Sequence, residues 1–213
     1  LYSIFEKAYL NNIIDTNPLS KVKLLAKSRS FNLKENEIDP FSNNDINIVL
    51  DSVNGYMHNF IKLMYSTGMR PGEIIALTWA DIDFEKRLIK VNKTIVSGNV
   101  GDVKTVSSIR EIDMLRNAEI ALLNQRELTK DYTSVFLNQS KKQFFSHDII
   151  NKHFKLLLEK NDIKVRSLYN IRHSFASQLI SKGINIVWVS KMLGHKDVSI
   201  TLKIYTKFIK EDD

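Results

Sequence analysis

Cysteine is absent from this sequence of 213 residues. Its absence excludes disulfide bonds, thiolate chemistry and zinc sites built from cysteine. The five histidines show no HExxH-like ligand spacing, so we expect no metal and no cofactor. No apolar run approaches the roughly 20 residues that span a bilayer, and the first residues lack the features of a signal peptide. The sequence therefore predicts an intracellular protein without a membrane partner.

Basic residues outnumber acidic ones, 31 to 24, which gives a net charge of +7 and a pI near 9.4. This excess suits a polyanionic partner, although it is also compatible with binding to a membrane surface or with solubility alone. A hydrophobic content of 43% and a charged content of 26% are ordinary for a globular protein. A chain of this length can bury one full core and carry a fragment of another domain.

The pattern along the chain changes twice, which predicts three segments: 1–20, 21–39 and 40–213. The first segment holds one amphipathic helix, expected over residues 3–14, which is too short to form a domain. The second carries five basic residues and no acid between positions 21 and 34, so we interpret it as a basic linker.

The third segment predicts a mainly helical domain with a small antiparallel β-sheet, an α+β fold. Ser42 and Asp45 have the spacing of a helix N-terminal cap, and Gly68 is placed to end a later helix. Polar and apolar residues alternate over 88–93, a turn is expected at 98–101, and residues 104–114 would form the returning strand. Helical patterns resume at 115–128 and 147–159.

The last fifth of the chain concentrates the residues with chemical potential. Gly183 and Gly194 each follow an apolar helical run, where a left-handed helix stop is usual, so His195 is expected just outside a helix. Ser199 is a candidate N-cap for one more short helix, and Tyr205 falls beside the apolar stripe of that helix.

Four motifs in this order resemble those of the tyrosine recombinase (phage integrase) family. They are Thr67-Gly68-Met69-Arg70-Pro71-Gly72-Glu73, Lys104-Thr105 ahead of Ser108-Ile109-Arg110-Glu111-Ile112, Arg172-His173-Ser174-Phe175-Ala176-Ser177, and Leu193-Gly194-His195 followed by Ile204-Tyr205-Thr206. The resemblance implies the tyrosine-recombinase catalytic domain fold over 40–213, with 1–20 as the tail of a preceding core-binding domain.

The resemblance also implies a function. The chain would be a site-specific DNA recombinase or integrase that cleaves and rejoins DNA through a 3′-phosphotyrosine, without metal or ATP. It would serve a mobile genetic element or chromosome-dimer resolution, in the cytoplasm and associated with the nucleoid. Its partner would be double-stranded DNA, on which it would form a homotetramer, and it would have no small-molecule substrate.

Breaking a phosphodiester without a metal requires a nucleophile, cations for the non-bridging oxygens and an acid for the leaving oxygen. By resemblance, Tyr205 is the nucleophile, Arg70 and Arg172 clamp the phosphate, and His195 donates a hydrogen bond to it. Lys104 would protonate the 5′-oxygen. Guanidinium suits the clamp because it is planar, bidentate and permanently charged.

Supporting roles are expected around these residues. Glu73 would buttress the site. Lys93 and Arg110 lie nearby in the predicted sheet, and Lys93 would be the next candidate if Lys104 is misassigned. The basic linker is either a solvated tether or a strap along the DNA phosphates, for which the candidates are Lys21, Lys23, Lys27 and Arg29.

One position departs from the family pattern, which usually has histidine three residues before the second arginine. Tyr169 stands there, and a phenol can donate a hydrogen bond but is a weak base near neutral pH, because its unperturbed pKa is about 10. We expect Tyr169 to share the face of Arg172 and to act as a donor. His173 points about 100° away from Arg172, so we interpret it as a packed core histidine.

Two alternatives remain open from the sequence. A type IB topoisomerase-like enzyme would use the same chemistry to relax supercoils, although the basic linker and the Leu193-Gly194-His195 spacing favour a recombinase. A catalytically silent, integrase-like DNA-binding module would need only the basic surface and the core. The joint presence of the five predicted catalytic residues of the family argues against it.

Overall fold

The computed structural model of the protein describes residues 2–20, 38–102 and 109–209. The chain divides into two compact units, Leu1–Glu37 and Ile38–Asp213. No helix in the described ranges is long and apolar enough to cross a membrane. The segment boundaries expected at residues 20 and 39 stay predictions.

The first unit contains helix α1 (Tyr2–Leu10), which is shorter than the helix predicted over 3–14. The helix ends early because Asn12 adopts a left-handed backbone conformation, with a φ of 54°, that asparagine tolerates better than most residues. After this turn, the Asn17 side-chain amide donates a hydrogen bond to the Glu6 carboxylate at 2.5 Å.

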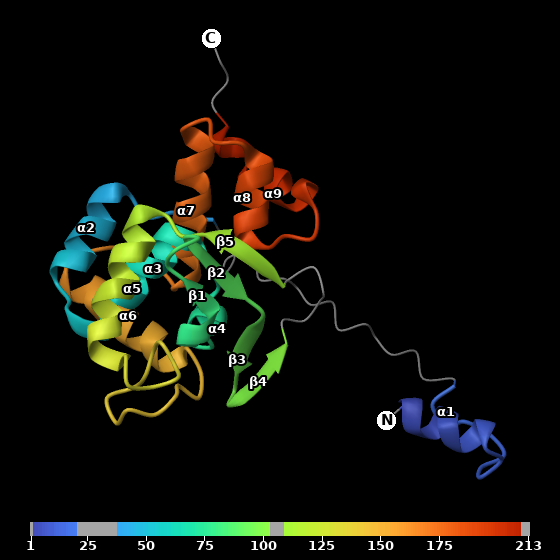
Figure 1. Cartoon of the computed structure of the whole chain (residues 1–213). Helices are drawn as coiled ribbons and strands as arrows, with labels where there is room; N and C mark the ends of the chain where they lie inside the picture. The colour runs from blue at the N-terminus through green and yellow to red at the C-terminus, as the bar shows by residue number, and fades with distance from the viewer. Residues whose placement is uncertain (1, 21–37, 103–108, 210–213) are drawn as a thin grey trace. The chain divides into compact units, whose positions relative to one another are not determined.

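The second unit is mainly helical with a small antiparallel sheet, so the predicted α+β class is confirmed. Its elements are α2 (Asn43–Asp51), α3 (Gly55–Thr67), α4 (Pro71–Ile74), η1 (Trp79–Asp81), β1 (Ile82–Asp83), β2 (Leu88–Val91), β3 (Lys93–Val96), β4 (Asn99–Asp102), β5 (Arg110–Asp113), α5 (Arg116–Thr129), α6 (Asp148–Lys160), α7 (Tyr169–Ser181), α8 (Ile186–Leu193), α9 (Val198–Tyr205) and η3 (Thr206–Phe208). Figure 1 shows α7, α8 and α9 grouped on one side of this unit and α2, α5 and α6 on the other.

Helix α3 is the centre of the core, because it packs against both α5 and α7. Phe60, Leu63 and Met64 on this helix are fully buried, and the Phe60 ring meets Phe136 edge to face at 5.5 Å. Burial of so many apolar side chains on one helix makes α3 the rigid reference for the segments that follow it.

Within the second unit, Ser42 and Gly68 mark helix ends as predicted, whereas Ser199 does not. Ser42 and Asp45 form the predicted capping box, and Gly68 ends α3 in the left-handed conformation, with a φ of 65°. The prediction that Ser199 caps the last helix is wrong. Asp197 is the N-cap, and its carboxylate accepts the Ser199 backbone N–H at 2.7 Å, because an aspartate two residues upstream reaches the first exposed N–H groups.

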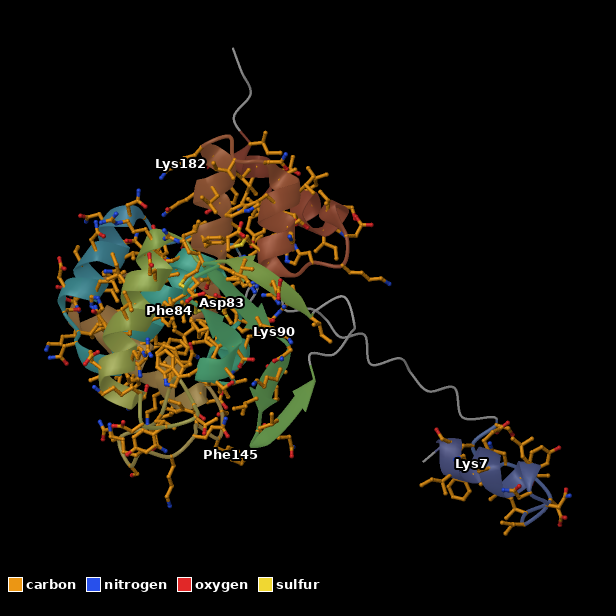
Figure 2. The ribbon with its side chains drawn as sticks, in the orientation of Figure 1. Lys7, Asp83, Phe84, Lys90, Phe145 and Lys182 are labelled. Atoms are coloured by element: carbon orange, nitrogen blue, oxygen red, sulfur yellow. The ribbon has the colours of Figure 1, made fainter. Side chains whose placement is uncertain are left out.

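The strands form two separate sheets, one ordered β1-β2-β5 and one made of β3 and β4. The turn expected at 98–101 is wrong, because residues 99–102 are strand β4. The hairpin turns instead at Ser97 and Gly98, whose φ values of 49° and 78° are those of a tight two-residue turn. The backbone N–H of Gly98 donates to the Phe145 carbonyl, and Figure 2 shows Phe145 near the tip of this hairpin.

A buried ion pair ties the helical core to the sheet. The Glu73 carboxylate on α4 accepts hydrogen bonds from the Arg110 guanidinium on β5 at 2.9 and 3.2 Å. The side chains of Glu73 and Arg110 are only 1% and 5% exposed. Burial raises the pKa of Glu73, but the hydrogen bonds and charge of Arg110 and the charges of Arg172 and Arg70 outweigh this effect. The pKa of Glu73 is therefore about 2, against an ordinary value of 4.5.

Replacement of Glu73 should therefore destabilise the fold. Glu73→Gln keeps the shape of the side chain but removes the negative charge from a buried ion pair, which should cost about 3–5 kcal/mol of unfolding free energy in a denaturant titration. Because the folded pKa is depressed, the parent should keep this stabilisation above about pH 4.5 and lose it as the pH falls toward about 2. The variant should lack that acid-dependent loss.

The matched control is Glu119→Gln, which removes the exposed ion pair between Arg87 and Glu119 at 2.8 Å. That change should cost less than about 1 kcal/mol, because exposed ion pairs contribute little. Equal effects of the two substitutions would contradict the account of Glu73.

Candidate active site

Arg70 lies between two helices, the first of which ends at Gly68 as predicted. Gly68 ends α3, and Pro71 begins α4 immediately after Arg70. The Glu73 carboxylate accepts both the backbone N–H of Arg70 at 2.9 Å and a guanidinium N–H at 2.8 Å. The Arg70 side chain remains 34% exposed, so it is oriented by Glu73 while still reaching solvent.

Arg172 on α7 is almost fully buried, with 4% of its surface exposed. Its guanidinium donates to the Gly68 carbonyl at 2.5 Å and to the Leu193 carbonyl at 2.7 Å, so it links the end of α3 to the end of α8. Burial and the charges of Arg70 and Arg110 lower the pKa of Arg172 to about 9, which leaves the side chain charged at neutral pH.

The C-terminal end of α8 is held by two buried arginines. A helix leaves its last four carbonyls without partners inside the helix. Here the Ser190 and Lys191 carbonyls accept N–H groups from the following turn, while Met192 and Leu193 accept from Arg110 and Arg172. Cations are favourable at this end of the helix macrodipole. The residues that follow α8 are thereby fixed beside the arginines.

His195 follows this helix end directly, as predicted. Gly194 precedes it with a φ of 66°, and a side chain at position 194 would come within 3 Å of the Arg110 guanidinium. The His195 Nδ1 lies 2.7 Å from the hydroxyl of the buried Thr201. Burial and the charges of Arg172, Arg70 and Arg110 lower the pKa of His195 to about 3, so its imidazole is neutral. If Thr201 donates to Nδ1, the proton resides on Nε2, which can then donate to an anion.

Tyr205 ends α9 and is 1% exposed. Burial raises the pKa of its phenol to about 12, although the charge of Arg172 acts in the opposite direction. The Tyr205 hydroxyl lies 2.7 Å from the Nδ1 of His173 on α7. His173, interpreted from the sequence as a packed core histidine, is partly buried, and Tyr205 is a partner that the sequence did not indicate. His173 does point away from Arg172, but α9 packs against α7 on that side and brings Tyr205 to it.

Tyr169 is the first residue of α7 and lies three positions before Arg172. Its side chain is 43% exposed, and its ring meets the His147 ring edge to face at 6.4 Å. The phenol is therefore accessible to a ligand, and its role as a donor stays a prediction.

The remaining predicted residues divide into two groups. Lys104 and the linker residues Lys21, Lys23, Lys27 and Arg29 lie outside the described residues. Lys93, the next candidate for the acid role, and its sheet neighbour Arg110 both have partners of their own. Lys93 pairs with the Asp81 carboxylate at 2.8 Å, and Arg110 pairs with Glu73. The acid role of Lys104 stays a prediction.

The structure brings together the predicted residues from distant parts of the sequence. Arg70, Glu73, Arg172 and His195 influence one another electrostatically, and the phenol of Tyr205 is influenced by Arg172. No cluster of three acidic or histidine residues in the described ranges could hold a metal ion. The positive charge of the site is that of arginine side chains.

Sequence reasoning did not predict the contacts of Arg110 with Glu73 and of His173 with Tyr205. The sequence did contain a signal for Arg110. It lies two positions before the apolar Ile112 on a strand, so the two side chains share the buried face, and a buried charge requires a partner. His173 carried none, because its contact with Tyr205 joins residues 32 positions apart on two different helices.

The chain matches the model of the phage integrase family over residues 32–211. It is 29% identical to a XerC-like tyrosine recombinase of Caldanaerobacter subterraneus, in an alignment covering 96% of this chain and 61% of that relative. It is 30% identical to the tyrosine recombinase XerD of Pasteurella multocida, covering 91% of this chain and 63% of that relative. The chain thus spans about three fifths of the length of these relatives.

The fold also matches solved structures. The Tn1549 transposon integrase in complex with circular intermediate DNA superposes with a TM-score of 0.72 at 21% identity, covering 83% of this chain and 64% of that chain. A lambda integrase dimer bound to a core site gives a TM-score of 0.63 at 15% identity, covering 100% and 72%. With the family match extending over most of the sequence, this chain belongs to the phage integrase family.

Proposed function

We propose that this chain is the catalytic part of a site-specific DNA recombinase that cleaves and rejoins DNA through Tyr205. The observation that carries the proposal is the convergence of Arg70, Arg172 and His195, from three separate elements, on a site that also holds the Tyr205 hydroxyl. A phosphodiester is the substrate that matches two guanidinium groups, a neutral imidazole donor and an oxygen nucleophile.

In the proposed step, the Tyr205 oxygen attacks phosphorus as the phenol loses its proton. The bond from phosphorus to the 5′-oxygen breaks, and Lys104 supplies a proton to that oxygen. Arg70, Arg172 and the Nε2 of His195 stabilise the charge on the non-bridging oxygens. The product is a 3′-phosphotyrosine and a free 5′-hydroxyl, which can attack in turn and restore the DNA without ATP.

We also propose duplex DNA as the partner and a homotetramer on DNA as the assembly. The Tn1549 integrase structure contains DNA, and the lambda integrase structure is a dimer on DNA. The open groove between β5 and α8 is lined by Lys191 and Lys196 as well as by Glu111 and Asp197, so the support for a polyanionic partner comes from the net charge of +7 of the whole chain. The predicted linker cations would extend this contact, and association with the nucleoid would follow from DNA binding.

The family match favours recombination over the two alternatives. The motifs of a relaxing topoisomerase would not explain resemblance to XerC-like and XerD recombinases over more than 90% of this chain. Incubation with a supercoiled plasmid separates these activities, because a topoisomerase relaxes plasmid without a specific site. A silent DNA-binding module would bind DNA without forming a covalent adduct.

The test of the proposal uses a pool of nicked suicide duplexes with randomised cores, incubated with the chain in EDTA. Departure of the short strand past the nick should trap a covalent protein–DNA adduct that survives denaturation. Tyr205→Phe should form no adduct and should still bind DNA in a mobility-shift assay. Tyr132→Phe, which changes another tyrosine that is 42% exposed, is the control and should react like the parent. The proposal would be overturned if Tyr205→Phe formed an adduct, or if the parent formed its adduct only when EDTA was left out.

The role of Tyr169 is tested on the adduct-forming duplex from that pool. Tyr169→Phe removes one donor to a charged oxygen, worth about 1.5–3 kcal/mol, so single-turnover cleavage should slow about 10- to 150-fold. Tyr169→His should keep or raise the rate, because imidazole can donate at the same place. A silent Phe variant with a damaged His variant would instead mean that Tyr169 only packs against His147.

A further inference from the structure

We propose that His173 is the general base that accepts the phenolic proton of Tyr205 during cleavage and returns it during rejoining. This inference rests on the proposed function and adds a catalytic residue to it. Cleavage by a phenol leaves a proton that must go to some group. The arrangement around Tyr205 places one imidazole nitrogen in contact with the reacting oxygen itself.

The contact has the geometry of a proton transfer. The Nδ1 of His173 lies 2.7 Å from the Tyr205 oxygen, and the ring centroids are 5.8 Å apart with planes inclined at 52°. A candidate base must lie within about 2.6–3.2 Å of the proton donor, which this pair satisfies before any ligand is bound. The partners come from α7 and α9, so the contact is formed by tertiary packing.

The direction of the hydrogen bond follows from the surroundings of both groups. Burial, together with the charges of Arg172 and Lys207, lowers the pKa of His173 to about 4, so the ring is neutral and one nitrogen can accept. Burial raises the pKa of Tyr205 to about 12, so the phenol holds its proton. A phenol that donates to a neutral imidazole is the starting arrangement for general base catalysis.

The other candidate bases near the nucleophile have different contacts. Glu73 accepts hydrogen bonds from Arg70 and Arg110, and its carboxylate is needed there. His195 has its Nδ1 at the Thr201 hydroxyl. Tyr169 occupies the position where the family usually has histidine, and a phenol is a weak base near neutral pH. His173 therefore supplies a base function that Tyr169 does not.

The groups that face His173 explain how DNA could activate the transfer. They are Arg172 on the same helix, Tyr205 on α9, Lys207 on η3 and His195 after α8. The two cations oppose a positive charge on His173 while no anion is present. A phosphate bound at Arg172 adds negative charge beside the ring and favours the imidazolium. The proton would then move as Tyr205 attacks, and the site would stay inactive without DNA.

The proton balance closes over the full reaction. In cleavage, the bond between the Tyr205 oxygen and phosphorus forms, its proton passes to Nδ1 of His173, and the 5′-oxygen leaves with a proton from Lys104. In rejoining, the 5′-hydroxyl gives its proton back to the lysine and attacks phosphorus, while the imidazolium of His173 reprotonates the departing Tyr205 oxygen.

The test compares His173→Asn with the parent on the adduct-forming duplex. The Asn side-chain oxygen can accept the hydrogen bond of Tyr205 and hold the ring, but it cannot take the proton at neutral pH. Single-turnover cleavage should fall about 100-fold or more, since general base catalysis contributes about 10²- to 10⁴-fold. His153→Asn, a change at an exposed histidine on α6, is the matched control and should leave the rate unchanged.

A second measurement separates proton acceptance from mere positioning. Tyr205 is replaced biosynthetically by difluorotyrosine, whose phenol is more acidic and ionises without a strong base. The loss in His173→Asn should then shrink by at least about tenfold, because the missing base matters less for a phenol that is already partly ionised. If His173→Asn fails to fold, as judged by circular dichroism, the same comparison is made with His173→Gln.

The outcomes are distinct. A cleavage rate of His173→Asn within about threefold of the parent overturns the proposal, since a base contributes far more than that. A large loss that difluorotyrosine does not relieve also overturns it, because His173 then only holds Tyr205 in place. If the parent forms no adduct through Tyr205, the proposed function fails first, and that result is recognised in the parent before any His173 variant is measured.

Discussion

The Glu73 carboxylate is the constraint on which the rest of the site depends. It is nearly fully buried and accepts hydrogen bonds from two guanidinium groups, those of Arg70 on the helix junction and Arg110 on β5. A buried charge of this kind is tolerated only when it is paired and fully hydrogen-bonded. Its cations are therefore held in fixed positions, and one of them, Arg70, still presents part of its side chain to solvent.

From this carboxylate the order extends to the nucleophile. Arg110 and Arg172 donate hydrogen bonds to the last two carbonyls of α8, so a shift of the turn that carries His195 would break both bonds. Such preorganisation matters for phosphoryl transfer, where catalysis is mainly positioning and electrostatic stabilisation. The proposed enzyme would hold its cations in place before DNA binds. The Tyr205 phenol would still carry its proton and donate it in a hydrogen bond to His173.

Local signals in the sequence predicted most of the helices and the places where they end. Gly68, Pro71 and Gly194 specify backbone conformations that few other residues adopt, and they placed Arg70 and His195 correctly. The α+β class also followed from periodicity. The prediction of a turn at 98–101 was wrong because the spacing of the two glycines suggested a longer loop than the tight turn that forms at Ser97 and Gly98.

Contacts between distant segments were harder to predict. Arg110 joins Glu73 across 37 positions, and His173 joins Tyr205 across 32, and neither spacing produces a local pattern. The helix geometry of about 100° per residue separates Arg172 from His173, but it does not indicate which element packs on each face of α7. The packing of α9 against α7 is what brings Tyr205 to His173.

The most direct test of the account is the identity of the amino acid that becomes linked to DNA. The trapped adduct is digested with protease and nuclease, and the modified peptide is sequenced by mass spectrometry. The account predicts a nucleotide joined through its 3′-phosphate to Tyr205. A nucleotide on Tyr169, which begins α7 three positions before Arg172, or a linkage through a 5′-phosphate, would contradict it.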